Sequence, residues 1–176
     1  VQTCALPIYD QMINIIKTLY LKYFELTSAI CATLIIVLAI LMEKLLYLNA
    51  CNLCILARFA FAGIALVSFS AHFFKKYQLV HKLFNIFFSL SGLVFMGRQI
   101  MLQNLPEEEV MMLEGCGLPL FTTFEYYGVF NGILMALKGG SSCAKIDWEF
   151  IFNFAEWGFL FFSIYLITNL HKIFSK

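Results

Sequence analysis

The sequence predicts an all-α membrane protein: a bundle of four transmembrane helices, with an amphipathic segment lying on the membrane surface in the second outer loop. Hydrophobic residues make up 61% of the 176 residues and charged residues only 13%, whereas soluble domains have about 45–50% and about 25%. The mean hydropathy is +0.83. A soluble domain of this size cannot hide so much apolar surface, because it still exposes roughly a third of the area of its unfolded chain. The net charge of +1 and the lack of a basic run exclude disorder and a nucleic-acid partner.

Residues 1–25 are predicted to form a cytoplasmic segment before the first span. Within it, residues 1–8 have neither the basic start nor the apolar stretch of a signal peptide. We expect these eight residues, Cys4 included, to be a fragment boundary or an assembly scar outside the fold.

Four segments are long and apolar enough to cross the bilayer, a task that needs about 20 mostly apolar residues. They form one predicted domain over 26–171, with helices at about 26–43, 53–74, 83–102 and 154–171. Arg58, Arg98 and Glu156 lie near segment ends, where a long side chain reaches the headgroups at modest cost.

The lysines predict the orientation, because short cytoplasmic loops are enriched in Lys and Arg. One side of the membrane has only Asp10 and Glu25 as acids but collects seven lysines: Lys17, Lys22, Lys75, Lys76, Lys82, Lys172 and Lys176. Both termini are therefore predicted to be cytoplasmic, and the loops at about 44–52 and 103–153 to be outside. In the second loop, residues 121–137 are too short and too interrupted by glycine to span, so we expect them to lie on the membrane surface.

Four of the six cysteines fall on the outer side, where disulfides persist. They are Cys51, Cys54, Cys116 and Cys143, and they can pair in three ways. The spacing Cys51-x-x-Cys54 closes a small ring that is suited to thiol–disulfide exchange more than to stabilisation. Cys54 is expected in the first turn of the second span, where free N–H groups and the helix dipole favour a thiolate.

The cysteines and the neighbouring Arg58 also have simpler interpretations than redox chemistry. Cys116 and Cys143 could form one ordinary bridge or an exchangeable one. Arg58 follows Cys54 at i+4, on the same helical face, and either stabilises a thiolate and an anionic oxygen beside it or only reaches the headgroups. A zinc site is not expected, because the outer loops contain no His and no second CxxC. Cys31, inside the first span, is interpreted as a small apolar packing residue.

Three motifs resemble the DsbB family of bacterial inner-membrane, disulfide-generating oxidoreductases. They are CNLCILAR at 51–58, GRQIMLQNLPEEEV at 97–110 and CAKIDWEF…AEW at 143–157. Their order and spacing agree with the family, as does one cysteine in each half of the second outer loop. The resemblance implies re-oxidation of a periplasmic DsbA-like thioredoxin-fold protein, with a membrane quinone (ubiquinone or menaquinone) as electron acceptor and no metal.

The resemblance also implies roles for individual residues. The reduced partner would attack a Cys116–Cys143 disulfide, with Cys116 as the mixed-disulfide position. Electrons would then pass to the Cys51–Cys54 pair by exchange. Cys54 would face the quinone as a thiolate, and Arg58 would stabilise the charge on both.

Other positions match the family less completely. Arg98 and Gln99 fit its pattern at the outer end of the third span, where they support either the quinone pocket or only the headgroup interface. Ala57 stands where members often have an acidic residue, and Ala155 where a proline is usual. The second outer loop also lacks a His that some members carry near their quinone, so the quinone preference stays open.

Two alternatives remain. A vitamin K epoxide reductase-like enzyme is also a four-helix, quinone-linked redox protein, but there the loop cysteines precede the CxxC, whereas here they follow it. A structural protein with four spans and inert loop disulfides would have no need for Arg58.

Overall fold

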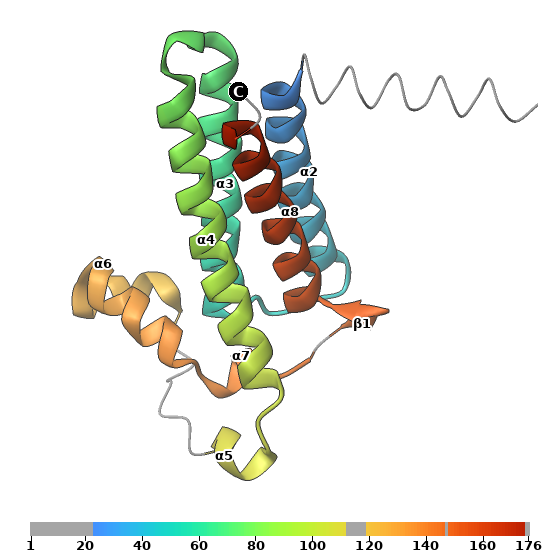
Figure 1. Ribbon diagram of the computed structural model, residues 1–176. Helices are drawn as coiled ribbons and strands as arrows, with labels where there is room; N and C mark the ends of the chain where they lie inside the picture. The colour runs from blue at the N-terminus through green and yellow to red at the C-terminus, as the bar shows by residue number, and fades with distance from the viewer. Residues whose placement is uncertain (1–22, 112–118, 147, 175–176) are drawn as a thin grey trace, which may run out of the picture.

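Four long helices pack side by side in the computed structural model, which describes residues 23–111, 119–146 and 148–174 (Figure 1). The helices are α2 (Phe24–Leu45), α3 (Asn52–Phe73), α4 (Gln78–Gln103) and α8 (Phe154–Phe174). The start of α2 and the end of α8 lie at the same end of the bundle as the α3–α4 connection, which we call the connector end. The opposite end, where the chain between α4 and α8 gathers, is called the loop end.

Three of the four long helices have the composition of membrane spans. Three segments, namely α2, α3 and the stretch Lys75–Gln103, are long and apolar enough to cross a membrane. Large apolar side chains cover the outward faces of the bundle, as lipid contact requires; examples are Leu34, Leu38, Leu66, Phe69, Phe84 and Phe87. The prediction of a helical, multi-pass membrane protein is therefore confirmed.

The connection between α3 and α4 is shorter than expected. A basic connector was predicted up to residue 82, but only the 3-10 turn η1 (Lys75–Tyr77) separates the two helices. The helix starts early because Lys82 is held inside the bundle instead of in solvent. Its side chain is only 7% exposed, and its Nζ donates to the carbonyl oxygen of Lys172 on α8 at 3.0 Å.

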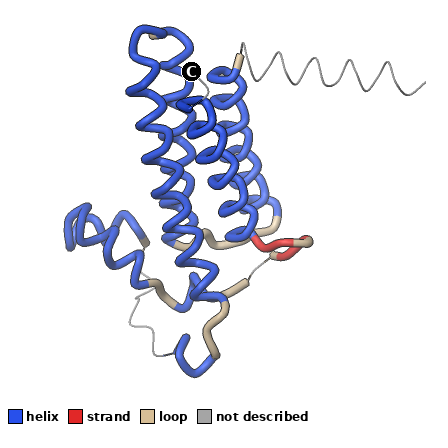
Figure 2. The backbone as a smooth tube through the Cα atoms, viewed as in Figure 1, coloured by secondary structure: helices blue, strands red, loops and turns tan. Residues whose placement is uncertain are grey.

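The chain between α4 and α8 contains regular structure of its own at the loop end (Figure 2). Its elements are α5 (Glu107–Met111), α6 (Leu120–Lys138), α7 (Ser141–Ala144), β1 (Glu149–Phe150) and β2 (Phe152–Asn153). The predicted surface segment lies in α6, which bends at Gly128, where φ is 76°. The two strands form a short antiparallel hairpin that the sequence did not predict, since strands of two residues leave no period to detect.

Close contacts with glycine bring α8 against α4. The ring of Phe162 lies directly over Gly92, and Met96 packs over Gly158 in the same antiparallel seam. Phe162 also stacks on Phe61 of α3, with ring centroids 3.9 Å apart. Small residues at helix contacts allow this approach, which supplies the packing that holds membrane helices together.

A layer of polar side chains crosses the bundle nearer the connector end. The hydroxyls of Ser28 on α2 and Ser68 on α3 are 3.2 Å apart, and Asn85 Nδ2 on α4 donates to Ser68 Oγ at 3.0 Å. On α8, Tyr165 donates from its hydroxyl to the carbonyl oxygen of Ser28 at 2.9 Å. Hydrogen bonds of this kind link all four helices and fix how each is rotated toward its neighbours.

The glycine seam makes a stability prediction with a control on the same helix. A methyl group in Gly92→Ala would overlap the Phe162 ring, whereas in Gly97→Ala it would meet the nearest atom of Phe159 at an ordinary 3.6 Å. We expect Gly92→Ala to lower the free energy of unfolding in detergent by about 1–3 kcal/mol, the usual cost of overpacking, and Gly97→Ala to leave it nearly unchanged. Equal stabilities of the two variants would contradict the close α4–α8 contact.

Candidate active site

The CxxC pair lies at the start of α3, at the loop end. Cys51 is the N-cap residue, with an extended backbone, and its Sγ accepts the backbone N–H of Cys54 at 3.4 Å. This contact satisfies one of the N–H groups that a helix leaves unpaired in its first turn. The cap places Cys54 in that turn, with its side chain one helical turn before Arg58.

The two thiols of the pair are in contact. The Cys51 and Cys54 sulfur atoms are 3.2 Å apart, with the Cys51 thiol as the donor, and all four cysteines in the described part of the chain are free thiols. Cys51 is only 6% exposed. A pair this close needs little movement to close a disulfide, whose sulfur atoms are about 2.05 Å apart.

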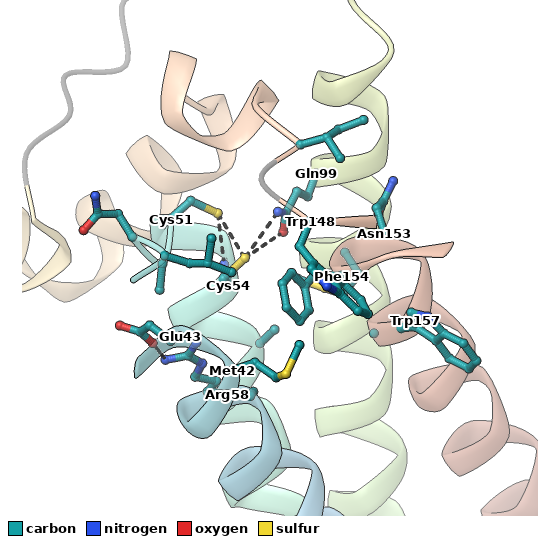
Figure 3. A pocket seen from close by; sticks show the side chains of 18 of the residues that line it. Met42, Glu43, Cys51, Cys54, Arg58, Gln99, Trp148, Asn153, Phe154 and Trp157 are labelled. Carbon is teal, nitrogen blue, oxygen red and sulfur yellow. Dashed lines mark hydrogen bonds and ion pairs between the residues drawn. The ribbon is translucent and has the colours of Figure 1, made fainter. Parts of the chain in front are cut away.

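Gln99 of α4 contacts the Cys54 sulfur from across the bundle (Figure 3). Its Nε2 lies 3.2 Å and its Oε1 3.4 Å from Sγ, and the side chain is 4% exposed. An amide donates to a thiolate and accepts from a thiol. Gln99 is therefore able to stabilise Cys54 in either protonation state.

The structure also brings Cys143 of α7 against the CxxC pair. Cys143 is 2% exposed and packs with Cys51, Leu53 and Leu102. The contact with Cys51, helped by the backbone of Gly140 and Leu53, lowers the pKa of the Cys143 thiol below its ordinary value. The same contact with Cys143 raises the pKa of Cys51. Cys116, the remaining predicted redox cysteine, lies outside the described residues.

A cavity of about 490 Å³ opens beside Cys54, between the loop ends of the helices (Figure 3). Ligand pockets typically enclose about 300–1,000 Å³ and have a mostly apolar wall with few polar groups, and this cavity fits both criteria. Its wall includes three aromatic side chains from the segment around the start of α8: Trp148, Phe154 and Trp157. Four residues singled out in the sequence also line it: Cys51, Cys54, Arg58 and Gln99.

Arg58 has a partner that the sequence analysis did not anticipate. Its Nη1 forms an ion pair with Glu43 Oε2 at the end of α2, and the two side chains are 24% and 32% exposed. Glu43 also lines the cavity. A local signal existed, because the two opposite charges lie near the facing ends of two predicted spans that a short connection joins.

Arg98 lies apart from this cavity, unlike its neighbour Gln99. It donates from Nε to the carbonyl oxygen of Leu137 at 2.9 Å and from Nη2 to that of Lys138 at 3.1 Å. Successive helical residues point about 100° apart, and α4 is rotated so that Gln99 lines the cavity while Arg98 points to the end of α6. Arg98 thus ties the end of α6 to α4 and satisfies carbonyl groups at a helix C-terminus.

The aromatic wall was not predicted as a site, because aromatic residues at helical spacing resemble lipid-facing side chains. Its position depends on how α8 starts. Asn153 Oδ1 accepts the backbone N–H of Glu156 at 3.0 Å, and Glu156 Oε2 accepts that of Asn153 at 2.9 Å. This reciprocal capping box fixes where α8 begins, between Trp148 and Trp157. The role of Glu156 is thus a helix cap.

Known proteins resemble this chain over nearly all of its described length. The family model for disulfide bond formation protein DsbB matches residues 22–171. A protein of Marinobacter nauticus named "Disulfide bond formation protein B" is 32% identical over 151 residues, which cover 84% of this chain and 88% of that protein. Proteins of the same name from Saccharophagus degradans and an Acidovorax species are 30% and 26% identical, over 73% and 90% of this chain and 78% and 90% of their own lengths.

The contact between Cys51 and Cys143 makes a prediction about thiol reactivity. In the reduced protein, we expect alkylation of Cys143 by iodoacetamide to rise with pH around a midpoint below the ordinary thiol value, because the contact with Cys51 lowers the pKa of Cys143 and the thiolate is the reactive form. Mass spectrometry of the peptides would follow Cys143 separately. Cys51→Ala should move the midpoint upward by removing a hydrogen bond to the thiolate. A midpoint near the ordinary thiol value of about 8.5 in both proteins would contradict the contact.

Proposed function

The chain belongs to the DsbB family of disulfide bond formation proteins, and we propose that it is a quinone-dependent thiol oxidoreductase that re-oxidises a periplasmic DsbA-like protein. The observation that carries this proposal is the position of Cys54. Its sulfur contacts Cys51 on one side and Gln99 on the other, and it lies on the wall of an apolar cavity. Such a thiol can exchange disulfides with other cysteines and pass electrons to a ligand in the cavity.

We propose that all four long helices cross the bacterial inner membrane. With 21 residues, α8 is about as long as α2 and α3, and it presents large apolar side chains outward: Phe159, Ile164, Ile167 and Phe174. The connector end, with its lysines, would face the cytoplasm together with both termini. The loop end would face the periplasm, and α6 would lie on the membrane surface with its exposed Phe121, Val129 and Phe130 in the interface.

The cavity suits the headgroup of ubiquinone or menaquinone. Its aromatic side chains offer flat apolar surfaces to a quinone ring, and Arg58 and Gln99 supply N–H donors to the ring's carbonyl oxygens. A bound quinone would supply the electron sink, because its reduction to the quinol takes up two electrons and two protons. The lining of the cavity includes Leu38 of α2, which is exposed on the outer face of the bundle, so an isoprenoid tail would have an apolar path from the cavity to lipid.

The cysteines would act in series, and their contacts favour an order. Attack by the partner on the Cys116–Cys143 disulfide releases the Cys143 thiolate, which a lowered pKa makes a good leaving group. Cys143 lies against Cys51, so its thiolate attacks the Cys51 sulfur and breaks the Cys51–Cys54 bond. This step releases the Cys54 thiolate at the cavity wall, beside the Gln99 amide.

Three further steps complete the cycle. The second thiol of the partner attacks its mixed disulfide with Cys116, which releases the oxidised partner and the Cys116 thiolate. Attack by Cys116 on Cys143 then restores the Cys116–Cys143 disulfide and releases the Cys51 thiol. Cys51 and Cys54 then give up two electrons and two protons in the cavity as their own disulfide closes again. The sum oxidises two partner thiols to one disulfide and leaves the four cysteines of this chain unchanged.

Quinone reduction in a purified mixture tests the proposal. It would combine this protein, a reduced DsbA-like protein and a short-chain ubiquinone, and follow the absorbance of the oxidised quinone. We expect the wild type to consume the quinone and Cys54→Ser to lose all turnover, because the thiol at the cavity wall is gone. Cys31→Ser is the matched control, since Cys31 lies exposed within α2, and it should keep full activity.

A trapping measurement separates the two halves of the relay. Cys54→Ser should still form a mixed disulfide with the partner through Cys116, because that step does not involve Cys54. No turnover by the wild type with ubiquinone or menaquinone and a competent partner would contradict the proposed function. That result would favour a membrane protein with structural disulfides.

A further inference from the structure

Glu43 is the single carboxylate among the described residues that line the cavity. It comes from α2, and its ion pair with Arg58 joins two helices beside Cys54 (Figure 3). We infer that Glu43 is a positioning residue of the quinone site: it holds the Arg58 guanidinium on the cavity wall, where the remaining N–H groups meet a carbonyl oxygen of the ligand. This inference rests on the proposed function, because it names a residue that prepares the site for its ligand.

Arg58 needs such a partner because its position allows two orientations. It lies on α3 near the loop end, where a long cationic side chain can extend to the lipid headgroups. That orientation would move the guanidinium away from the apolar cavity, whose wall has little to offer a positive charge. The contact with Glu43 selects the other orientation, in which Arg58 borders the same cavity as Cys54.

The ion pair leaves most of the guanidinium free to bind a ligand. Arginine has five N–H donors in a rigid plane, and the contact with Glu43 is made by Nη1. Fixing one corner of a planar group restricts where its other donors point. A carbonyl oxygen in the cavity then meets donors already in place, and binding avoids the cost of ordering a long side chain.

The carboxylate is itself held at a defined point. The backbone N–H of Leu48 donates to the Glu43 carbonyl oxygen at 3.0 Å, and that of Leu46 donates to Met42 at 3.0 Å. Between them, Tyr47 adopts a left-handed conformation with φ of 52°. The chain therefore turns back on the end of α2 directly after Glu43, which fixes the backbone from which the carboxylate reaches Arg58.

The ion pair is expected to orient the Arg58 side chain more than to stabilise the fold. Both side chains are partly exposed, and exposed ion pairs contribute little to the free energy of unfolding. Pairing does make Arg58 easier to keep next to an apolar space, because an unpaired charge there would be costly to desolvate. Removing Glu43 should therefore affect the binding of a ligand more than the stability of the fold.

Binding of a short-chain ubiquinone to the intact protein in detergent tests the inference without turnover. The chain has two tryptophans, Trp148 and Trp157, and both line the cavity, so quenching of tryptophan fluorescence reports the quinone Kd directly. We expect Glu43→Ala to raise this Kd about three- to tenfold, the value of roughly one hydrogen bond. Glu43→Gln, which keeps an acceptor oxygen for Nη1, should restore most of the affinity.

Two controls show whether Glu43 acts through Arg58. In an Arg58→Ala background, Glu43→Ala should have no further effect on Kd, because there is no guanidinium left to position. Glu108→Ala removes an exposed carboxylate on α5, away from the cavity, and should leave Kd unchanged. In the quinone reduction assay, Glu43→Ala should raise the quinone KM far more than it lowers kcat, whereas trapping of the partner stays as in the wild type.

Several outcomes would overturn the inference. An unchanged Kd in Glu43→Ala, an equal loss of affinity in both Arg58 backgrounds, or tighter binding on removal of the carboxylate would each exclude a positioning role. If Glu43→Ala failed to fold, as shown by the loss of its thermal unfolding transition, Glu43→Gln would decide instead. A quinone Kd of Glu43→Gln as weak as that of Arg58→Ala would show that an acceptor oxygen at residue 43 does not position the guanidinium, and it would overturn the inference. Failure of the wild type to bind or reduce any quinone would instead contradict the proposed function.

Discussion

The ring of Phe162 on α8 lies over Gly92 of α4 and stacks on Phe61 of α3, and this contact sets the spacing of these three helices. Only the face of α4 that carries Gly92 allows this close approach, because a larger side chain would push the helices apart. The rotation of α4 about its axis is therefore fixed. Gln99 follows Gly92 by two helical turns on the same face of α4. The rotation of α4 that places Gly92 against Phe162 therefore also points Gln99 into the site, where it contacts the sulfur of Cys54.

A membrane removes water as a partner for polar side chains, so the chain must supply their partners itself. Nearer the connector end, the hydrogen bonds of Ser28, Ser68 and the Asn85 amide nitrogen meet part of this demand and link the helices, while Asn85 Oδ1 is buried without a partner among the described residues. At the loop end, Glu43 and Arg58 meet it by pairing with each other. The first set holds the helices in place, and the second lies beside a cavity large enough for a ligand.

The central position among the described thiols belongs to Cys51, which contacts both Cys54 and Cys143. Its two neighbours differ in surroundings: Cys54 faces the cavity and Gln99, whereas Cys143 belongs to the short helix α7 between α4 and α8. This arrangement gives each thiol a different task in the proposed relay. Part of it follows from the sequence, since a CxxC at the start of a helix places its second cysteine in the first turn.

Patterns along the chain were enough to predict a helical membrane protein, a CxxC at a helix start and Arg58 one turn beyond it, because apolar composition and i,i+4 spacing are local properties. Contacts between distant residues depended on the tertiary structure. Gln99 contacts the sulfur of Cys54, 45 residues away in sequence, and Glu43 forms an ion pair with Arg58 of the neighbouring helix. Arg98, next to Gln99 in sequence, instead binds the end of α6. The rotation and spacing of packed helices decide such contacts, and neither is encoded in the hydropathy of a single segment.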